Sequence, residues 1–115
     1  DRSYAAVSHF PHMLSAAYMA GIAGRAAAGE ITSYAGTGFR DMTRIAASSP
    51  EMWRDIGLAN RETLLAEFAA FRAPLDALEA ALRDGDAQKL EALLAVAAWA
   101  RRSWAARRDG SDGVE

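Results

Sequence analysis

Residues 64–82, LLAEFAAFRAPLDALEAAL, decide the fold of this chain. Leucine and phenylalanine recur there at spacings of 4, 3, 4, 3 and 4 residues, at Leu64, Phe68, Phe71, Leu75, Leu78 and Leu82. Such spacing aligns large apolar side chains in one stripe along a helix, and that stripe must pack against another helix. We therefore predict a long helix, bent at Pro74 because proline lacks an amide donor.

The residues on either side of this stretch mark where the helix begins and ends. Ser49 is a good N-cap, Pro50 suits the first helical position, and Glu51 complements the positive end of the helix dipole. At the far end, Gly85 should terminate the helix and Asp86 should cap a last one. The apolar residues of that last helix are Leu90, Leu93, Leu94 and Ala97.

The chain before residue 48 is also predicted to be helical. We expect a first helix from about residue 3 to 25, kinked at Pro11, in which Gly21 and Gly24 permit close approach of another helix. A turn-prone break at 29–38 and a short helix at about 39–47 should follow. Because no segment alternates apolar and polar residues long enough to form a strand, the predicted fold class is all-α.

The sequence predicts one helical domain over residues 1–108 and a disordered tail over 109–115. The last helix ends in a basic cluster, which suits the negative end of a helix dipole. Its members are Arg101, Arg102, Arg107 and Arg108.

Composition narrows the function classes. The 115 residues are 51% hydrophobic and 24% charged, with a formal net charge of −2, so no basic excess favours nucleic acid or an acidic membrane. The absence of cysteine excludes disulfides, thiolate metal sites and thiol nucleophiles. No apolar run is long enough to span a bilayer. Nothing indicates secretion, and we expect a cytoplasmic protein.

Polar residues are densest in two short segments. The first holds both histidines, His9 and His12, which lie three residues apart and share roughly one helix face. They are either a structural pair or part of a ligand site. Two histidines alone are too few for a metal site, although a carboxylate such as Asp41 could join them.

The second segment, residues 36–44, is glycine-rich but lacks the strand and glycine spacing of a nucleotide loop. Asp41 and Arg44 either form an intrahelical ion pair, or Arg44 presents its guanidinium to a substrate carboxylate. Trp53, on the first turn of the long helix, is by itself most typical of a core or interface residue.

Three blocks resemble signatures of the prephenate dehydrogenase family, in the family's order and spacing. Asp1-Arg2 with residues 5–12, AAVSHFPH, is similar to the family's HD…AxVSHLPH. Residues 38–46, GFRDMTRIA, resemble GFRDxTRIA, and residues 48–56, SSPEMWRDI, resemble SDPEMWRDI, with Asn60-Arg61 matching the NR that follows. The departures at Phe10, Met42 and Ser49 are mild.

The resemblance implies a Rossmann domain, absent from this chain, followed by an all-helical domain. That second domain is similar to the C-terminal domain of 6-phosphogluconate dehydrogenase and forms an intertwined homodimer. The implied activity is the NAD- or NADP-dependent oxidative decarboxylation of prephenate or arogenate in tyrosine biosynthesis. The cofactor would bind the absent domain, so this chain alone should hold no catalytic, cofactor-binding or metal residues and be inactive.

The resemblance also implies roles for individual residues. His12 corresponds to a histidine that points at the substrate, and His9 to one with a more structural role. Arg44 corresponds to an arginine that holds a substrate carboxylate. Asp41 and Trp53 correspond to residues that line or gate the pocket, partly across the dimer axis.

Two alternatives remain beside the enzyme domain: a purely structural helical dimerisation module, and a regulatory domain that binds tyrosine as feedback inhibitor. The polar density at His9, His12, Asp41 and Arg44 favours the enzyme domain over the first. The sequence leaves open the choices between prephenate and arogenate, and between NAD and NADP.

Overall fold

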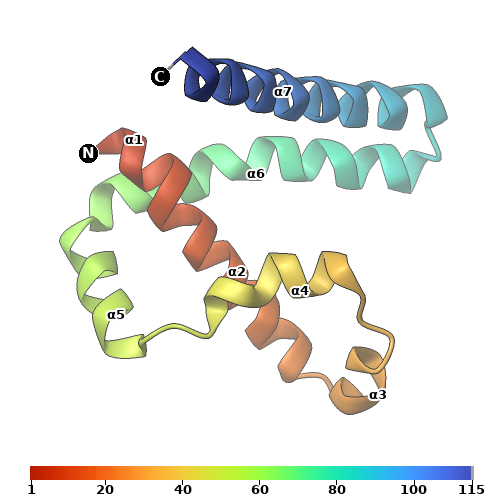
Figure 1. Ribbon diagram of the computed structural model, residues 1–115. Helices are drawn as coiled ribbons and strands as arrows, with labels where there is room; N and C mark the ends of the chain where they lie inside the picture. The colour runs from red at the N-terminus through yellow and green to blue at the C-terminus, as the bar shows by residue number, and fades with distance from the viewer. Residues whose placement is uncertain (115) are drawn as a thin grey trace. The chain divides into compact units, whose positions relative to one another are not determined.

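The computed structural model describes residues 1–114, and the side chains of residues 1–110. Within residues 1–114 every regular element is helical, which confirms the predicted all-α class (Figure 1). The elements are α1 Arg2–Tyr4, the π-helical turn η1 Ala5–His9, α2 Phe10–Ala23, α3 Ala28–Thr32, α4 Thr37–Thr43, the 3-10 turn η2 Arg44–Ala46, α5 Pro50–Ala59, α6 Arg61–Asp84 and α7 Ala87–Val114.

The chain divides into two compact units, Asp1–Ala70 and Phe71–Glu115, with α6 contributing to both. The sequence led us to expect one domain over residues 1–108, and that assignment stays a prediction. None of the helices in the described part of the chain is both long and apolar enough to cross a lipid bilayer.

The expected disturbance at Pro11 takes the form of a π-helical turn. Proline donates no hydrogen bond, and in an α-helix its ring would clash with the carbonyl four residues earlier, that of Val7. The turn Ala5–His9 widens instead, and the amide of Phe10 donates to the carbonyl of Ala5. The helix therefore passes from α1 through η1 into α2 without a break.

The core of the first unit forms between α2, α5 and the start of α6. Phe10 and Leu64 are buried, and the ring of Phe10 meets that of Phe68 edge-on with centroids 4.8 Å apart. The close helix approach occurs at Gly57, where an added Cβ would lie 3.3 Å from Met13 Cε. No neighbouring helix approaches Gly21 or Gly24 among the described residues, contrary to expectation.

The long helix predicted from residue 50 to 84 is interrupted at Asn60, and this prediction was wrong. Asn60 leaves helical geometry at φ −117° and ψ 28°, and its side-chain Nδ2 donates to the carbonyl of Ile56 at 2.8 Å. Thr63 Oγ1 donates to the carbonyl of Asn60 at 3.0 Å, at the start of α6. Short polar side chains can compete for backbone groups in this way, which ends one helix and begins the next.

In the second unit, the last turns of α6 lead through a tight connection into α7. Gly85 adopts φ 63°, and the amides of Gly85 and Asp86 donate to the carbonyls of Leu82 and Ala81, which is a Schellman ending. Asp86 Oδ1 then accepts from the amide of Lys89 at 3.0 Å. Both boundary predictions, Gly85 as terminator and Asp86 as cap, are confirmed.

Helix α7 extends to Val114, so positions 109–114 are helical where the sequence predicted a disordered tail. Glu115 lies outside the described residues. The basic residues of positions 101–108 are therefore within α7 rather than at its end, and Arg101 lies over the ring of Trp104, 4.8 Å from its centroid.

Candidate functional site

The two histidines and the tryptophan singled out in the sequence come together in the first unit. His12, near the start of α2, stacks on Trp53, in the first turn of α5, with ring centroids 3.5 Å apart and planes 14° apart. Ser49 caps α5 by accepting from the amide of Met52 at 3.2 Å, and Pro50 follows at the first helical position, as predicted. The cap places Trp53 one turn into the helix, against α2.

His9 adds a second ring to this cluster. It meets the edge of Trp53 at a centroid distance of 6.1 Å and lies nearly parallel to Tyr4 at 6.5 Å. Its Nδ1 is buried without a hydrogen-bond partner among the described residues. His9 ends the π-helical turn, so the widened turn sets which side of the helix it occupies.

Besides stacking on Trp53, the His12 ring makes polar contacts. Its Nε2 lies 3.0 Å from Ser48 Oγ, and Ser48 Oγ donates to the carbonyl of Ile45 at 2.6 Å. Burial lowers the pKa of His12 below its ordinary value of 6.5, and a hydrogen bond with the Ile45 backbone opposes that shift in part. The neutral imidazole is consequently the form that this environment favours at neutral pH.

Asp41 and Arg44 lie on the segment formed by α4 and η2, which packs against α2. Asp41 is exposed on α4, and Arg44 is exposed at the start of η2. No ion pair or hydrogen bond joins these two side chains among the described residues, and none joins either to the histidine cluster. The intrahelical ion pair left open by the sequence is therefore not formed.

Arg44 instead lines a cavity of about 330 Å³ at the junction of α4 and η2. Arg40, one helical turn earlier, also lines it, and no acidic side chain does. The other lining residues are Ala35, Gly36, Phe39, Thr43 and Ala47. Two guanidinium groups without an acidic neighbour make this hollow suited to an anion, because arginine forms two parallel hydrogen bonds with a carboxylate.

Residues 1–96 match the model of the family described as prephenate dehydrogenase, dimerization domain. The chain belongs to this family. The match covers the histidine cluster, the arginine cavity and α6, so the resemblance first noted over about 60 residues extends well into α7.

Named relatives agree with this assignment of the dimerization domain. The chain is 36% identical over 89 residues to a prephenate dehydrogenase of Bacillus subtilis, covering 73% of this chain and 23% of that protein. It is 37% identical over 90 residues to a cyclohexadienyl dehydrogenase of Zymomonas mobilis, covering 75% of this chain and 31% of that one. The chain thus spans 23% and 31% of the length of these two curated relatives.

A solved structure has the same helical arrangement as this dimerization domain. The crystal structure of Synechocystis arogenate dehydrogenase superposes with a TM-score of 0.84 at 28% sequence identity. The superposition covers 90% of this chain and 38% of that protein. The fold prediction is confirmed over most of the chain.

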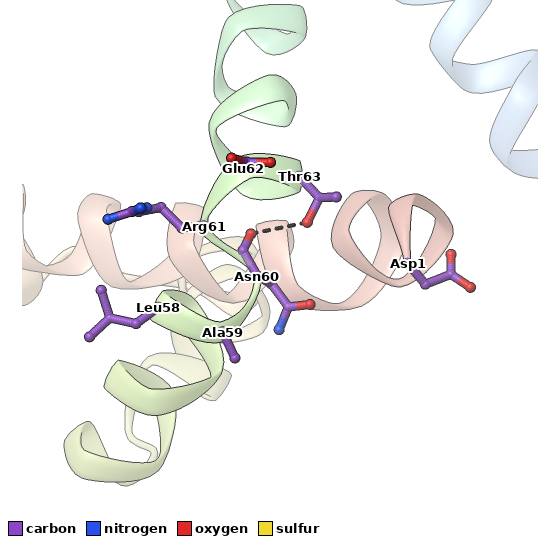
Figure 2. Close-up of a pocket in the computed structure, with 7 residues that line it drawn as sticks. All are labelled: Asp1, Leu58, Ala59, Asn60, Arg61, Glu62 and Thr63. Carbon is purple, nitrogen blue, oxygen red and sulfur yellow. Dashed lines mark hydrogen bonds between the residues drawn. The ribbon is translucent and has the colours of Figure 1, made fainter.

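A second hollow, also of about 330 Å³, lies where α5 meets α6 and near the start of the chain. Figure 2 shows that its side chains diverge, with Arg61 and Asp1 pointing to opposite sides. None of the predicted site residues lines it. Among the described residues, no three histidine, cysteine, aspartate or glutamate side chains gather within metal-binding range, and Asp41 does not join the histidines.

Sequence reasoning missed three residues of these sites. Ser48 contacts His12 from 36 positions away, Tyr4 stacks beside His9, and Arg40 shares the cavity of Arg44. Of the three, only Arg40 could have been predicted locally. It lies four residues before Arg44 in a helical segment, and that spacing places two side chains on the same helix face.

Proposed function

We propose that this chain is the dimerisation and substrate-binding domain of an NAD- or NADP-dependent prephenate or arogenate dehydrogenase. The names of its relatives support the reaction class. The observation that carries the substrate-binding role is the acid-free cavity lined by Arg44 and Arg40. Prephenate carries two carboxylates, and a site that binds it needs fixed positive charge.

Arg44 is the main anchor for a substrate carboxylate in this proposal. Arg40 reaches the same cavity and adds a second positive charge there. His12 faces the substrate from the stacked cluster, and His9 chiefly supports Trp53. Asp41 and Trp53 line or gate the pocket. Arg44 makes no ion pair among the described residues, so its charge is available to a ligand.

The nicotinamide cofactor belongs to another part of the full-length enzyme. Dinucleotide sites use a strand, a glycine-rich turn and a helix, and residues 1–114 contain no strand. We therefore expect the cofactor to bind a part of the enzyme other than this domain. The cofactor would accept hydride in the oxidative decarboxylation, while this domain positions the substrate. The chain alone should show no turnover of prephenate or arogenate.

The domain pairs with a second copy of itself through the apolar residues left exposed on α6 and α7. Leu82 is 66% exposed and Trp99 is 67% exposed. One face of α7 also carries a shallow hollow of about 450 Å³, where Glu91 is the only charged lining residue. Exposed apolar surface of this kind marks an interaction site.

The structural-module alternative predicts that the arginine cavity has no ligand. The regulatory alternative predicts that tyrosine binds the same pocket as the substrate, and it is compatible with an enzyme role. Direct titration of the full-length enzyme with tyrosine and with substrate distinguishes these outcomes.

The decisive test replaces Arg44 in the full-length enzyme that contains this domain. Arg44→Ala should lower kcat/KM about 30- to 1000-fold, equivalent to about 2–4 kcal/mol, because a desolvated carboxylate contact is lost. Arg44→Lys should recover little, since an ammonium group cannot reproduce the two-point contact.

Arg54→Ala is the matched control, because Arg54 is an exposed arginine that pairs with Asp55 at 3.0 Å on α5. It should leave the kinetics unchanged. An Arg44→Ala enzyme with normal kcat and KM but a lowered melting temperature would remove the anchor role and favour a structural one.

A further inference from the structure

The hydroxyl of Ser48 lies between the histidine cluster and the backbone of η2. Ser48 follows η2 and precedes the cap of α5, so its backbone is held between two helical elements. Its Oγ makes two contacts, at 2.6 Å to the carbonyl oxygen of Ile45 and at 3.0 Å to Nε2 of His12. These two contacts together determine where the protons lie.

A serine hydroxyl has one proton and two lone pairs. A carbonyl oxygen can only accept, so the short contact to Ile45 uses the Ser48 proton. Ser48 Oγ must then accept the second hydrogen bond, which requires His12 Nε2 to carry a hydrogen. In neutral imidazole only one ring nitrogen carries a proton, so His12 Nδ1 is left with its lone pair.

The remaining contacts of His12 agree with this proton arrangement. The ring stacks on Trp53 at 3.5 Å with planes 14° apart, so it cannot turn freely to move Nε2 away from Ser48. The backbone of Ile45 also forms a hydrogen bond with the ring that raises the pKa of His12, as expected when the ring donates to a carbonyl oxygen.

We propose that Ser48 is a positioning residue that fixes His12 as the Nε2–H tautomer, with Nδ1 presented as a hydrogen-bond acceptor. An acceptor at this position suits a ligand that donates a hydrogen bond, such as a hydroxyl group. That last step rests on the proposed function, whereas the tautomer does not depend on any substrate. Ser48 acts through His12 and needs no contact with the ligand.

Nuclear magnetic resonance of the full 115-residue chain tests the tautomer directly. The sequence has only two histidines, so labelling with 15N-histidine gives two ring systems, assigned with a His9→Gln variant. Long-range 1H–15N correlations above pH 7 should show His12 with a protonated Nε2 and an unprotonated Nδ1. A protonated Nδ1 in the wild-type chain would overturn the proposal.

Three variants separate Ser48 from its surroundings. Ser48→Ala should turn the single tautomer into a mixture, and Ser48→Thr should restore it because threonine keeps the hydroxyl. Ser49→Ala removes a neighbouring hydroxyl that caps α5 and does not touch His12, so it should leave His12 as the single Nε2–H tautomer. If Ser48→Ala keeps one Nε2–H tautomer with unshifted resonances, the Ile45 carbonyl suffices and Ser48 has no positioning role.

A parallel measurement in the full-length enzyme connects the tautomer to activity. Ser48→Ala should lower kcat/KM about tenfold, the effect of losing about one hydrogen bond, and Ser48→Thr should recover most of it. If Ser48→Ala changes the tautomer of His12 but the kinetics stay normal, Ser48 still positions His12. His12 is then not a substrate contact. The failures of the two proposals are therefore distinguishable.

Discussion

The two units of the chain differ in what they bury. In the unit Asp1–Ala70, helices α2, α5 and α6 enclose apolar side chains around Phe10 and Leu64. In the unit Phe71–Glu115, Ala81 is the only buried apolar residue among those described, and 3% of its surface is exposed. Both units expose large apolar side chains, but the first also buries Phe10, Ile22 and Leu64 within one chain, whereas the second buries none of that size among the described residues.

This difference assigns separate tasks to the two units. The histidine cluster and the arginine cavity both lie in the first unit, where the chain itself supplies the packing that positions side chains. The dimer contacts proposed above lie mainly in the second. Variants in each unit should therefore change different properties, and this expectation can be tested.

The largest effect is expected at Leu78, which is half-buried on α6 in the second unit, between the exposed Leu75 and Leu82. The wild-type chain should scatter light as a dimer at micromolar concentration. Leu78→Asp should dissociate or unfold it, because a buried, unpaired carboxylate costs several kcal/mol, comparable to the whole stability of a small domain.

Ala73→Asp provides the control for Leu78, since it adds the same charge to an exposed position of α6 outside the stripe. Light scattering and thermal melting measure both variants. A Leu78→Asp chain with wild-type mass and melting temperature would show that the stripe is not an interface or core.

The next largest effect is expected at Trp53, in the first unit. Trp53→Ala should lower the free energy of unfolding by about 2–3 kcal/mol, less than for a fully buried tryptophan because this side chain is half-buried. The dimer should persist, since the lost ring contacts lie within one chain. Chemical denaturation combined with light scattering checks this, with Trp53→Phe as the conservative control. Dissociation of the Trp53→Ala dimer would contradict the proposal that the dimer contacts lie mainly in the second unit.

A pH-dependent effect is expected from His12. Burial holds its pKa below the ordinary value of 6.5, so the unfolded chain takes up a proton at a higher pH than the folded chain. The free energy of unfolding should be unaffected above pH 6.5 and should fall as pH drops from 6.5 toward the folded-state pKa.

Denaturation of wild-type and His12→Gln chains across this pH range isolates the contribution of His12 to the pH dependence of stability, because His9 is present in both. The wild-type chain should lose more stability on acidification than the variant. Identical pH profiles would mean that the environment of His12 does not favour its neutral form.

The smallest effects are expected at the two helix caps, one in each unit. Ser49→Ala and Asp86→Ala each remove a side-chain oxygen that accepts from a backbone amide. Each should cost about 1 kcal/mol. The two losses should add in the double variant, because the caps share no contact among the described residues. A measured coupling well above about 0.5 kcal/mol would show that the units do not respond independently.

These caps also show what local sequence can predict. Ser49, Gly85 and Asp86 act through backbone groups only a few residues away, so their roles were correctly predicted. The helix break at Asn60 is local as well, but an asparagine within an otherwise periodic stretch gives no strong signal. The prediction there followed the apolar periodicity and missed the amide bond to Ile56.

The sequence predicted three residues that the structure brings into one cluster, but not the residues that contact them. Resemblance to family signatures singled out His9, His12 and Trp53, and the structure brings these three together. It did not reveal Ser48, because the contact with His12 joins residues 36 positions apart and depends on how α5 packs on α2. The roles of Asp41 and Arg44 stay predictions, although their ion pair is absent from the described residues.

The π-helical turn Ala5–His9 acts as an angular spacer in the first helix. A π-turn holds one residue more than an α-turn, and one residue corresponds to a rotation of about 100° around the helix axis. Deleting one residue from the turn would rotate Tyr4 to another side of the helix, away from the histidine cluster, and would leave the ring of Pro11 without the widened turn that accommodates it. A change in the length of this segment should therefore displace Tyr4, whereas a substitution at the exposed Val7 should not.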